Sequence, residues 1–262
     1  MKSKGEEAMP TLFITAGAKN TGFAIAEKFA ENGFDVALSS RNLEEAREAA
    51  ASIGNRYAVK TKGYALELTD VPQIRRVFQQ VKEDFGGLDT FVANAANLGI
   101  NTNLLSVDEQ EYANVMDVNL KGSFFCAQQA ALIMKEAGGG SIVFISSIHS
   151  NQCVFGRSLY STSKSGINAM MRSMALELAQ YHIRANCILA GAIRTDRWDG
   201  LTKEQMAARR ANWPLEIEST GEDIANGVFY LGTDLSRTVT GTELTIDSGI
   251  SISLLPYKEG KH

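Results

Sequence analysis

Short apolar segments alternate with longer amphipathic segments along most of the chain. The apolar segments have the length of β-strands and lie at 11–15, 35–39, 57–64, 88–94, 141–146, 183–189 and 241–247. Helical segments are expected at 22–32, 43–53, 71–85, in a long stretch that ends near 137, at 160–181 and near 221–231. Because the strands are apolar runs without strict alternation, we expect helices on both faces of the sheet. The pattern predicts the α/β class, with a doubly wound parallel sheet flanked by helices.

All of these elements are expected to form one domain. The chain has 262 residues and four prolines, and no Gly/Ser-rich or Pro-rich linker divides it. Its start carries charges but lacks the apolar centre of a signal peptide, so we expect a disordered lead-in at 1–9 and a domain at 10–262. In such a sheet, ligands bind beyond the carboxyl ends of the strands, where the strand order reverses.

Composition and charge narrow the functional classes. Hydrophobic residues make up 44% of the chain and charged residues 21%, and the net charge is −4. This charge gives no reason to expect nucleic acid or an anionic membrane as a partner. No apolar run approaches the roughly 18 residues of a membrane span. The three cysteines are scattered without CxxC spacing, which favours a reducing cytoplasm and argues against a metal site.

Tyr160 and Lys164 form the most informative pair in the sequence. They are four residues apart in YSTSK, so they share one face of the helix expected there. A phenol is a poor proton carrier at neutral pH, and a neighbouring cation favours the phenolate. The pair could therefore move a proton to or from a substrate oxygen. By its spacing alone, a solvated pair on a helix face is the commoner explanation.

The first strand is followed by a turn that could hold a phosphate. Its sequence is TAGAKNTG, at 15–22, and its small residues would let a phosphate approach the amides at the start of the next helix. Gly22 would let that helix pack closely against the sheet. The usual glycine fingerprint is incomplete, so a tight turn without a ligand remains an alternative.

The second strand ends in a hydroxyl and a cation, at Ser40 and Arg41. An acidic residue there would accept hydrogen bonds from an adenosine ribose and repel a 2′-phosphate. Arg41 instead offers a forked donor set to such a phosphate, and Lys19 in the preceding turn could approach the same group. The alternative is that Arg41 only caps the sheet edge and that Lys19 is solvated.

Two further polar residues are expected near Tyr160. Ser147 follows the strand SIVFIS, and its hydroxyl could hold a substrate carbonyl beside the phenol. Asn119 lies in DVNLKG within the long helix, where asparagine is mildly unfavourable. It either belongs to a solvated polar face or marks a backbone kink that holds a water beside Lys164.

Taken in order along the chain, these motifs resemble the short-chain dehydrogenase/reductase family, in its Tyr-x-x-x-Lys branch. The resemblance covers 11–251 and rests on ITAGAKNTGFAIA, DVNLKGSFF, SIVFISS, YSTSK, IRANCILAGAIRTD and ELTIDSG. It implies a single-domain Rossmann-type fold. It also implies an NADP(H)-dependent oxidoreductase that interconverts a carbonyl and a secondary alcohol.

The resemblance assigns roles to individual residues. Tyr160 would be the general acid and base, and Ser147 would orient the substrate oxygen. Lys164 would bind the nicotinamide ribose and assist Tyr160, while Asn119 would position a water in the proton relay. Lys19 and Arg41 match the positions that select NADP. Cofactor contacts are implied for Ala16, Lys19, Asn20, Thr21, Gly22, Ser40, Arg41, Glu67, Leu68, Asn94, Tyr160, Lys164, Gly191, Ile193 and Thr195.

Several residues depart from the family pattern, and all of them lie along the expected cofactor. Ala16 and Asn20 stand where the family has glycine, and Ala93 stands where it has asparagine. Asparagine tolerates a positive φ better than most residues, so we expect the turn to form. The departures keep open a function of another class, a cofactor-poor binding or scaffold protein. The complete set of catalytic residues favours an enzyme.

The substrate side is less distinctive. His149, Gln152 and Cys153 follow Ser147 and are expected to line the substrate pocket, although His149 could equally lie in a surface loop. The segment 196–214, with Trp198, matches the mobile substrate lid of the family. We favour a small polar ketone, sugar or polyol as the substrate. A 3-oxoacyl-acyl-carrier-protein reductase is the second candidate, because Arg209 and Arg210 could meet an acidic carrier.

Apolar side chains on two helices predict self-association. They are Ile167, Met170, Met171, Met174 and Leu178 on the Tyr160 helix, and Phe124, Phe125, Leu132 and Ile133 on the helix before it. One sheet is not expected to cover all of this surface, and exposed patches of that size mark interfaces. Related proteins pair these helices, so we expect a homotetramer, with a dimer as the alternative.

Overall fold

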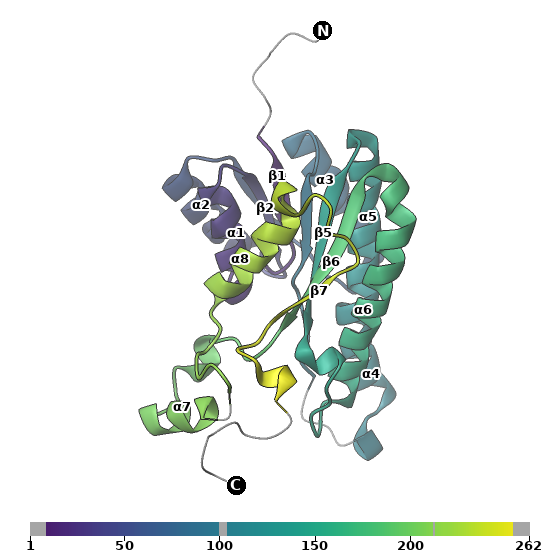
Figure 1. Ribbon diagram of the computed structural model, residues 1–262. Helices are drawn as coiled ribbons and strands as arrows, with labels where there is room; N and C mark the ends of the chain where they lie inside the picture. The colour runs from purple at the N-terminus through teal and green to yellow at the C-terminus, as the bar shows by residue number, and fades with distance from the viewer. Residues whose placement is uncertain (1–8, 100–103, 212, 254–262) are drawn as a thin grey trace.

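The computed structural model describes residues 9–99, 104–211 and 213–253. Within them, the strands form one parallel sheet in the order β3-β2-β1-β4-β5-β6-β7 (Figure 1). The order reverses between β1 and β4, which creates the ligand-binding crevice typical of this architecture. The strands are β1 (Thr11–Ile14), β2 (Asp35–Ser40), β3 (Thr61–Ala65), β4 (Thr90–Ala93), β5 (Gly140–Ser147), β6 (Ile183–Ala190) and β7 (Glu243–Ile246).

Helices cover both faces of the sheet (Figure 1). Those that pack in one core are α3 (Val71–Phe85), α5 (Ser123–Ala137) and α6 (Ser158–Leu178). Those that pack in the other core are α1 (Asn20–Glu31), α2 (Leu43–Tyr57) and α8 (Gly221–Gly232). The shorter α4 (Glu109–Met116) and α7 (Lys203–Arg210) lie at the carboxyl end of the sheet, near the bottom of the view.

The central strands are buried on both faces. Phe13 of β1 packs in the core beneath α3, α5 and α6, whereas its neighbours Leu12 and Ile14 pack in the opposite core. The same alternation holds in β4 for Phe91 and Val92. Successive side chains of a strand point to opposite faces, so a strand covered on both sides needs an uninterrupted apolar run. The predicted doubly wound α/β fold is therefore confirmed.

The start of the third strand and the continuity of the long helix were predicted wrongly. The third strand begins at Thr61 rather than at position 57, because α2 continues to Tyr57 and ends on Ala58, which has a φ of 57°. The Ala-rich interior of α2 favours helix, and no glycine marks its end. The long helix that ends at Ala137 is also interrupted. A π-helical segment, Asp117–Gly122, separates α4 from α5, and Asn119 lies within it.

Candidate active site

The residues expected to bind ligand gather at the carboxyl ends of the strands. The β1–α1 turn, the end of β2, the end of β4, Ser147 at the end of β5 and Gly191 after β6 all lie at this edge. In parallel strands these ends meet on one side of the sheet, which is the side where ligands bind. The topology therefore brings together segments that are up to 175 positions apart in sequence, from Ala16 to Gly191.

The β1–α1 turn has a strained backbone and a tight approach to α1. Ala16 and Asn20 have φ values of 51° and 50°. An asparagine tolerates this region well, whereas an alanine is strained there by about 1–2 kcal/mol. A Cβ on Gly22 would lie 2.1 Å from the Ala16 carbonyl oxygen and 2.7 Å from Asn94 Nδ2. Only glycine allows this packing of α1, whose first amides then face the turn, as phosphate binding requires.

Asn94 ties the end of β4 to this turn. Its side-chain Nδ2 donates to the carbonyl oxygens of Thr15 and Ala16, at 3.1 and 3.2 Å. Its backbone N–H donates to Thr15 Oγ1 at 3.0 Å. These bonds join the carboxyl ends of β1 and β4, the two strands between which the strand order reverses. Asn94 therefore shapes the turn in addition to lying near the expected ribose.

A cavity of about 430 Å³ opens beside the turn and the end of β2. Small, polar and charged side chains line much of it, and Leu68 contributes a buried apolar wall. Six of the expected cofactor residues line this cavity: Ala16, Lys19, Ser40, Arg41, Glu67 and Leu68. Asn20, Thr21, Gly22, Asn94, Gly191, Ile193 and Thr195 do not line it.

One further charged residue, Glu45, lines this cavity and was not predicted from the sequence. It lies in the first turn of α2, and its Oε1 accepts a hydrogen bond from Lys19 Nζ at 2.7 Å. Its Oε2 accepts a second hydrogen bond from Ser40 Oγ at 3.2 Å. The Lys19 hydrogen bond holds the pKa of the Glu45 carboxyl below its usual range. The same bond raises the pKa of Lys19. No sequence motif marks position 45, which adjoins Lys19 only after folding.

Lys164 is buried within the fold, with 1% of its surface exposed. Its Nζ donates to the carbonyl oxygen of Ile145 at 2.7 Å and lies 5.6 Å from the centre of the Tyr160 ring. Burial disfavours the charged form and lowers the pKa of Lys164 to about 8. Lys164 and Tyr160 therefore lie next to each other, as their spacing in the sequence predicted. Tyr160 itself is half-buried, and it does not line the cavity beside the β1–α1 turn.

Ser147 contacts the backbone of His149, and the ring of His149 adjoins Tyr160. Ser147 is 7% exposed, and its Oγ donates to the Ala190 carbonyl oxygen at 3.3 Å and accepts from the His149 N–H at 3.2 Å. The ring of His149 meets that of Tyr160 edge to face, with centroids 5.8 Å apart. Desolvation lowers the pKa of His149, so its neutral form is favoured beside the phenol.

Asn119 is fully buried and uses both ends of its side chain within the protein. Its Oδ1 accepts from the Asn97 N–H at 2.6 Å, and its Nδ2 donates to the Asn97 carbonyl oxygen at 2.8 Å and to Ser163 Oγ at 3.0 Å. Ser163 Oγ in turn donates to the Tyr160 carbonyl oxygen at 2.8 Å. Asn119 thus joins the loop after β4 to the helix that carries Tyr160 and Lys164. The alternative of a solvated polar face is wrong, because Asn119 is buried. The backbone is irregular here, as the other alternative expected, in a π-helical segment of a kind frequent at functional sites. The water expected beside Lys164 stays a prediction.

The segment after β6 holds the remaining expected cofactor residues. Gly191 packs so closely on the residue that follows β7 that an added Cβ would lie 2.6 Å from Asp247 Cβ. Ile193 forms an isolated bridge with Ser219, and the Thr195 carbonyl oxygen accepts from the Trp198 N–H at 2.9 Å. These contacts fix the path of the chain from the sheet into the segment at 196–214.

That segment packs on itself. The Trp198 and Trp213 ring centroids are 6.1 Å apart, and the Arg209 guanidinium lies 4.4 Å from the Trp198 ring. Arg210 Nε lies 3.0 Å from Glu218 Oε1, so that guanidinium already has an acidic partner. On the opposite loop, Cys153 is exposed and Gln152 Nε2 donates to the Ser251 carbonyl oxygen. Trp198 therefore contacts other residues of this segment, and the four residues expected on the substrate side do not form one cluster.

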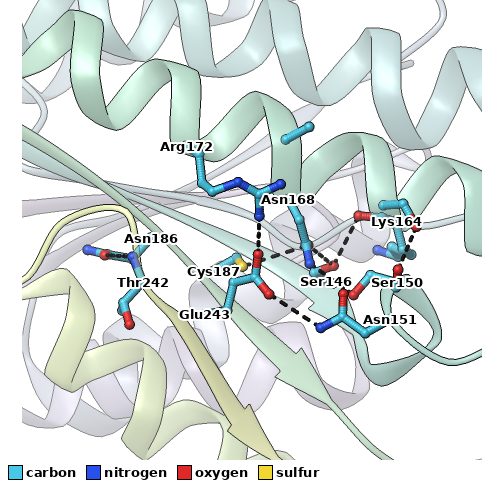
Figure 2. Close-up of polar contacts among 12 residues, drawn as sticks. Ser146, Ser150, Asn151, Lys164, Asn168, Arg172, Asn186, Cys187, Thr242 and Glu243 are labelled. Atoms are coloured by element: carbon cyan, nitrogen blue, oxygen red, sulfur yellow. Dashed lines mark hydrogen bonds and ion pairs between the residues drawn. The ribbon is translucent and has the colours of Figure 1, made fainter.

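A polar network centred on Asn168 lies next to Lys164 on α6, and it was not predicted from the sequence. Figure 2 shows Asn168 between Ser146 and Ser150, one helical turn beyond Lys164. Asn168 Oδ1 accepts from Ser146 Oγ at 2.6 Å, and Asn168 Nδ2 donates to Ser150 Oγ at 2.9 Å. Ser150 Oγ donates to the Ser147 carbonyl oxygen at 2.7 Å. The network therefore links α6 to the segment that carries Ser147.

Neither a metal centre nor a membrane span is found in the described part of the chain. There, no group of three or more His, Cys, Asp or Glu side chains could hold a metal ion. No helix of that part is both long and apolar enough to cross a membrane. The donor set instead fits a nicotinamide dinucleotide. A helix amino terminus behind a tight turn suits the pyrophosphate, and the cavity beside it offers cations and hydroxyls to a ribose.

Known proteins match this chain over most of its length. A family model described as enoyl-(acyl carrier protein) reductase matches residues 16–251. A 3alpha-hydroxysteroid dehydrogenase from Mediterraneibacter gnavus is 34% identical and covers 89% of this chain and 94% of its own. A Yarrowia lipolytica protein named as an NADP-dependent mannitol dehydrogenase is 30% identical, covering 90% and 85%. A 3-oxoacyl-acyl-carrier-protein reductase FabG from Staphylococcus aureus is 30% identical, covering 90% and 96%.

A solved structure shows the same architecture. The crystal structure of a protein described as a short-chain alcohol dehydrogenase, from Sinorhizobium meliloti 1021, superposes with a TM-score of 0.88 at 31% identity. The alignment covers 95% of this chain and 98% of that one. With these relatives, the chain is an oxidoreductase that uses a nicotinamide cofactor to interconvert an alcohol and a carbonyl. It belongs to the short-chain dehydrogenase/reductase family.

Proposed function

We propose that this enzyme prefers NADP(H) and reduces or forms a small polar ketone, sugar or polyol. The observation that carries the cofactor preference is the cavity beside the β1–α1 turn. Lys19, Arg41 and the Ser40 hydroxyl line it together, at the place where an acidic residue would mark an NAD-selective site. The mannitol dehydrogenase relative, named as NADP-dependent, supports the same preference.

In the proposed reaction, the residues near the Tyr160 phenol have separate roles. A bound nicotinamide ring supplies or accepts the hydride. Tyr160 gives a proton to, or takes one from, the substrate oxygen, and Ser147 holds that oxygen by hydrogen bonding. Lys164 binds the ribose and places a positive charge beside the phenol, which favours the phenolate. Asn119 holds the loop after β4 against the Tyr160 helix, so we assign it a positioning role.

The polar substrate class rests on His149. Its ring adjoins Tyr160 edge to face, and its Nδ1 is buried without a hydrogen-bond partner among the residues that the structure describes. A hydroxylated substrate bound beside the phenol would give this nitrogen a donor. The loop that follows also exposes Phe155, which is 93% accessible. A larger apolar carbonyl compound is therefore the appropriate substrate to compare with a polar one.

One experiment tests both parts of the proposal. Purified protein is titrated with NADPH and NADH by nucleotide fluorescence, and turnover is then measured on a panel of polyols and their ketones, a 3-hydroxysteroid and a 3-oxoacyl thioester. The proposal expects tighter binding of NADPH and the highest kcat/KM on a polyol or its ketone. Tighter binding of NADH would contradict the cofactor preference. Preferred turnover of the steroid or thioester would contradict the substrate class.

Reduction of a 3-oxoacyl carrier-protein thioester is the second candidate. Arg209 is exposed on α7, at the carboxyl edge of the sheet where an acidic carrier would approach. The pairing of Arg210 with Glu218 removes half of the basic pair expected there, which weakens this candidate. Turnover of a carrier-bound substrate in large excess over the free thioester would favour it.

We also propose that the protein assembles as a homotetramer through α5 and α6. Of the nine apolar residues from which self-association was predicted, Ile133, Ile167 and Met171 are buried in the core. Five of the other six, Phe124, Leu132, Met170, Met174 and Leu178, line a groove of about 650 Å³ between the two helices, whereas Phe125 packs against the core. Phe124 and Leu132 are 42% and 52% exposed. Light scattering coupled to gel filtration tests the assembly, and a monomer would contradict it.

A further inference from the structure

Glu45 places a negative charge where an NADP(H)-selecting site needs only positive ones. Its carboxylate lines the same cavity as Lys19, Ser40 and Arg41. It engages two of these three residues at once, through the 2.7 Å bond from Lys19 Nζ and the 3.2 Å bond from Ser40 Oγ. The third, Arg41, is close enough to act electrostatically on the Glu45 carboxyl. Every group expected to hold a 2′-phosphate is therefore already influenced by Glu45.

From this arrangement we propose that Glu45 limits the preference of the enzyme for NADP(H) over NAD(H) by competing with the 2′-phosphate for Lys19 and Ser40. The inference rests on the proposed function, because it concerns the same adenosine cavity. In this proposal, the selectivity for NADP(H) depends on Lys19 and Arg41, which attract the 2′-phosphate, and on Glu45, which repels it.

The competition follows from the hydrogen-bonding capacities of the groups. A carboxylate and a phosphate both only accept hydrogen bonds, so neither can satisfy the other. A phosphate monoester carries a charge of about −1.5 to −2 at neutral pH, and a carboxylate nearby repels it. In NADP(H) binding the phosphate therefore competes with Glu45 for the single donor of Ser40 and for the donors of Lys19, while the carboxylate repels it. NAD(H) has a neutral hydroxyl at this position and is not repelled.

Glu44 supplies a matched control from the same turn of the same helix. It follows the amino-terminal cap of α2, as Glu45 does, and both residues lie in the acidic first turn. Glu44 pairs with Arg47 at 2.8 Å on the outer surface and does not line the cavity. Glu44→Gln and Glu45→Gln thus remove the same charge and the same favourable interaction with the helix dipole. They differ in whether the charge faces the cavity.

The test measures dissociation constants of NADPH and NADH for the wild type, Glu45→Gln and Glu44→Gln by nucleotide fluorescence. A surface ion pair and a like-charge repulsion in water each change affinity by a factor of a few. Glu45→Gln is therefore expected to tighten NADPH binding roughly fivefold to twentyfold and to change NADH binding less than about twofold. Glu44→Gln should change either constant less than about twofold, since its charge lies outside the cavity.

Two further measurements identify the cause. Raising the salt concentration to about 0.5 M should reduce the gain in Glu45→Gln, because charge interactions at the surface are screened. In a Lys19→Gln background the gain from Glu45→Gln should shrink, because there is no longer a lysine to release. Thermal melting of each variant verifies that the exposed substitutions leave the fold intact.

The possible outcomes separate the two proposals. Unchanged or weaker NADPH binding by Glu45→Gln would overturn the inference and would mean that Glu45 merely orients Lys19. An equal gain in Glu44→Gln would also overturn it, since net charge would then be the cause. A wild type that binds NADH more tightly than NADPH, with a clear gain in Glu45→Gln, would contradict the proposed cofactor preference and support the inference. A protein that binds neither nucleotide would overturn both.

Discussion

Two lysines at the carboxyl edge of the sheet make hydrogen bonds of the same length in opposite environments. Lys164 Nζ donates to the Ile145 carbonyl oxygen at 2.7 Å and is almost completely buried. Lys19 Nζ donates to Glu45 Oε1 at 2.7 Å, and 64% of its side chain is exposed. Burial lowers the pKa of Lys164 to about 8, whereas the Glu45 hydrogen bond raises the pKa of Lys19.

In the proposed function, the buried Lys164 serves the proton transfer and the exposed Lys19 serves the choice between NADP(H) and NAD(H). Around Lys164 the protein replaces water with fixed dipoles, so each charge acts strongly and each polar partner matters for folding. Around Lys19 the charges face solvent, act weakly and can be exchanged without disturbing the core. Substitutions in the buried region should therefore cost activity and stability, whereas those near Lys19 should change selectivity alone. The following predictions test this contrast, from the largest expected effect to the smallest.

Tyr160→Phe should reduce turnover by about 10²–10⁴-fold, the usual contribution of a positioned proton carrier. The ring remains beside His149, so the melting temperature and the nucleotide dissociation constants should change little. Steady-state kinetics on a substrate found in the panel provides the measurement. Turnover close to that of the wild type would show that another group handles the proton.

Lys164→Met should alter the pH dependence of stability. In the cofactor-free protein the pKa of Lys164 is about 8, whereas the unfolded chain keeps the lysine protonated to higher pH. The buried charge therefore destabilises the fold at neutral pH, and this cost falls as the pH rises from about 8 towards the unfolded pKa. Between about pH 7 and pH 9.5, the wild type should gain about 2 kcal/mol relative to Lys164→Met.

Urea denaturation at several pH values measures this difference. Lys121→Met is the matched control, because Lys121 forms an exposed ion pair with Asp117. Its stability should follow that of the wild type over the same pH range. If Lys164→Met also follows the wild type, Lys164 keeps an ordinary pKa and the contrast between the two lysines fails.

Arg41→Ala should weaken NADPH binding by about 1.5–3 kcal/mol, the range for hydrogen bonds to charged groups, and leave NADH binding nearly unchanged. Arg41 is exposed, so the free energy of unfolding should stay within about 0.5 kcal/mol of the wild type. Fluorescence titration with both nucleotides distinguishes the outcomes. An equal loss for NADPH and NADH would mean that Arg41 does not contact the 2′-phosphate.

The sheet and the proximity of Tyr160 to Lys164 could be predicted from the sequence because both depend on local patterns. Strands buried on both faces must be apolar runs, and the spacing of Tyr160 and Lys164 follows from the helix repeat. Glu45 and Asn168 were missed for a common reason. Each acquires its partners only through folding, Glu45 from the β1–α1 turn and Asn168 from β5 and the loop after it. The α2 boundary was missed because no glycine marked its end.

Asn168→Ala is expected to have the smallest effect on activity in this series. The substitution leaves the Ser146 and Ser150 hydroxyls without their bonds to the amide, in the network of Figure 2. Loss of buried hydrogen bonds should lower the free energy of unfolding by about 1–3 kcal/mol. Because Ser150 also holds the Ser147 carbonyl oxygen, kcat should fall roughly threefold to tenfold, by analogy with the energies of single hydrogen bonds.

Asn151→Ala is the control for this variant. Asn151 is exposed, and its Nδ2 reaches Glu243 Oε2 only at 3.4 Å, so its loss should cost less than about 0.5 kcal/mol. Because Asn168 lies away from the adenosine cavity, Asn168→Ala should leave both nucleotide dissociation constants unchanged while kcat falls. A drop in stability with full kcat would mean that Asn168 only stabilises the fold. The enzyme would then keep its turnover despite small displacements of Ser147. The surroundings of Lys164 and of Lys19 would differ in their contribution to stability and not in their contribution to catalysis.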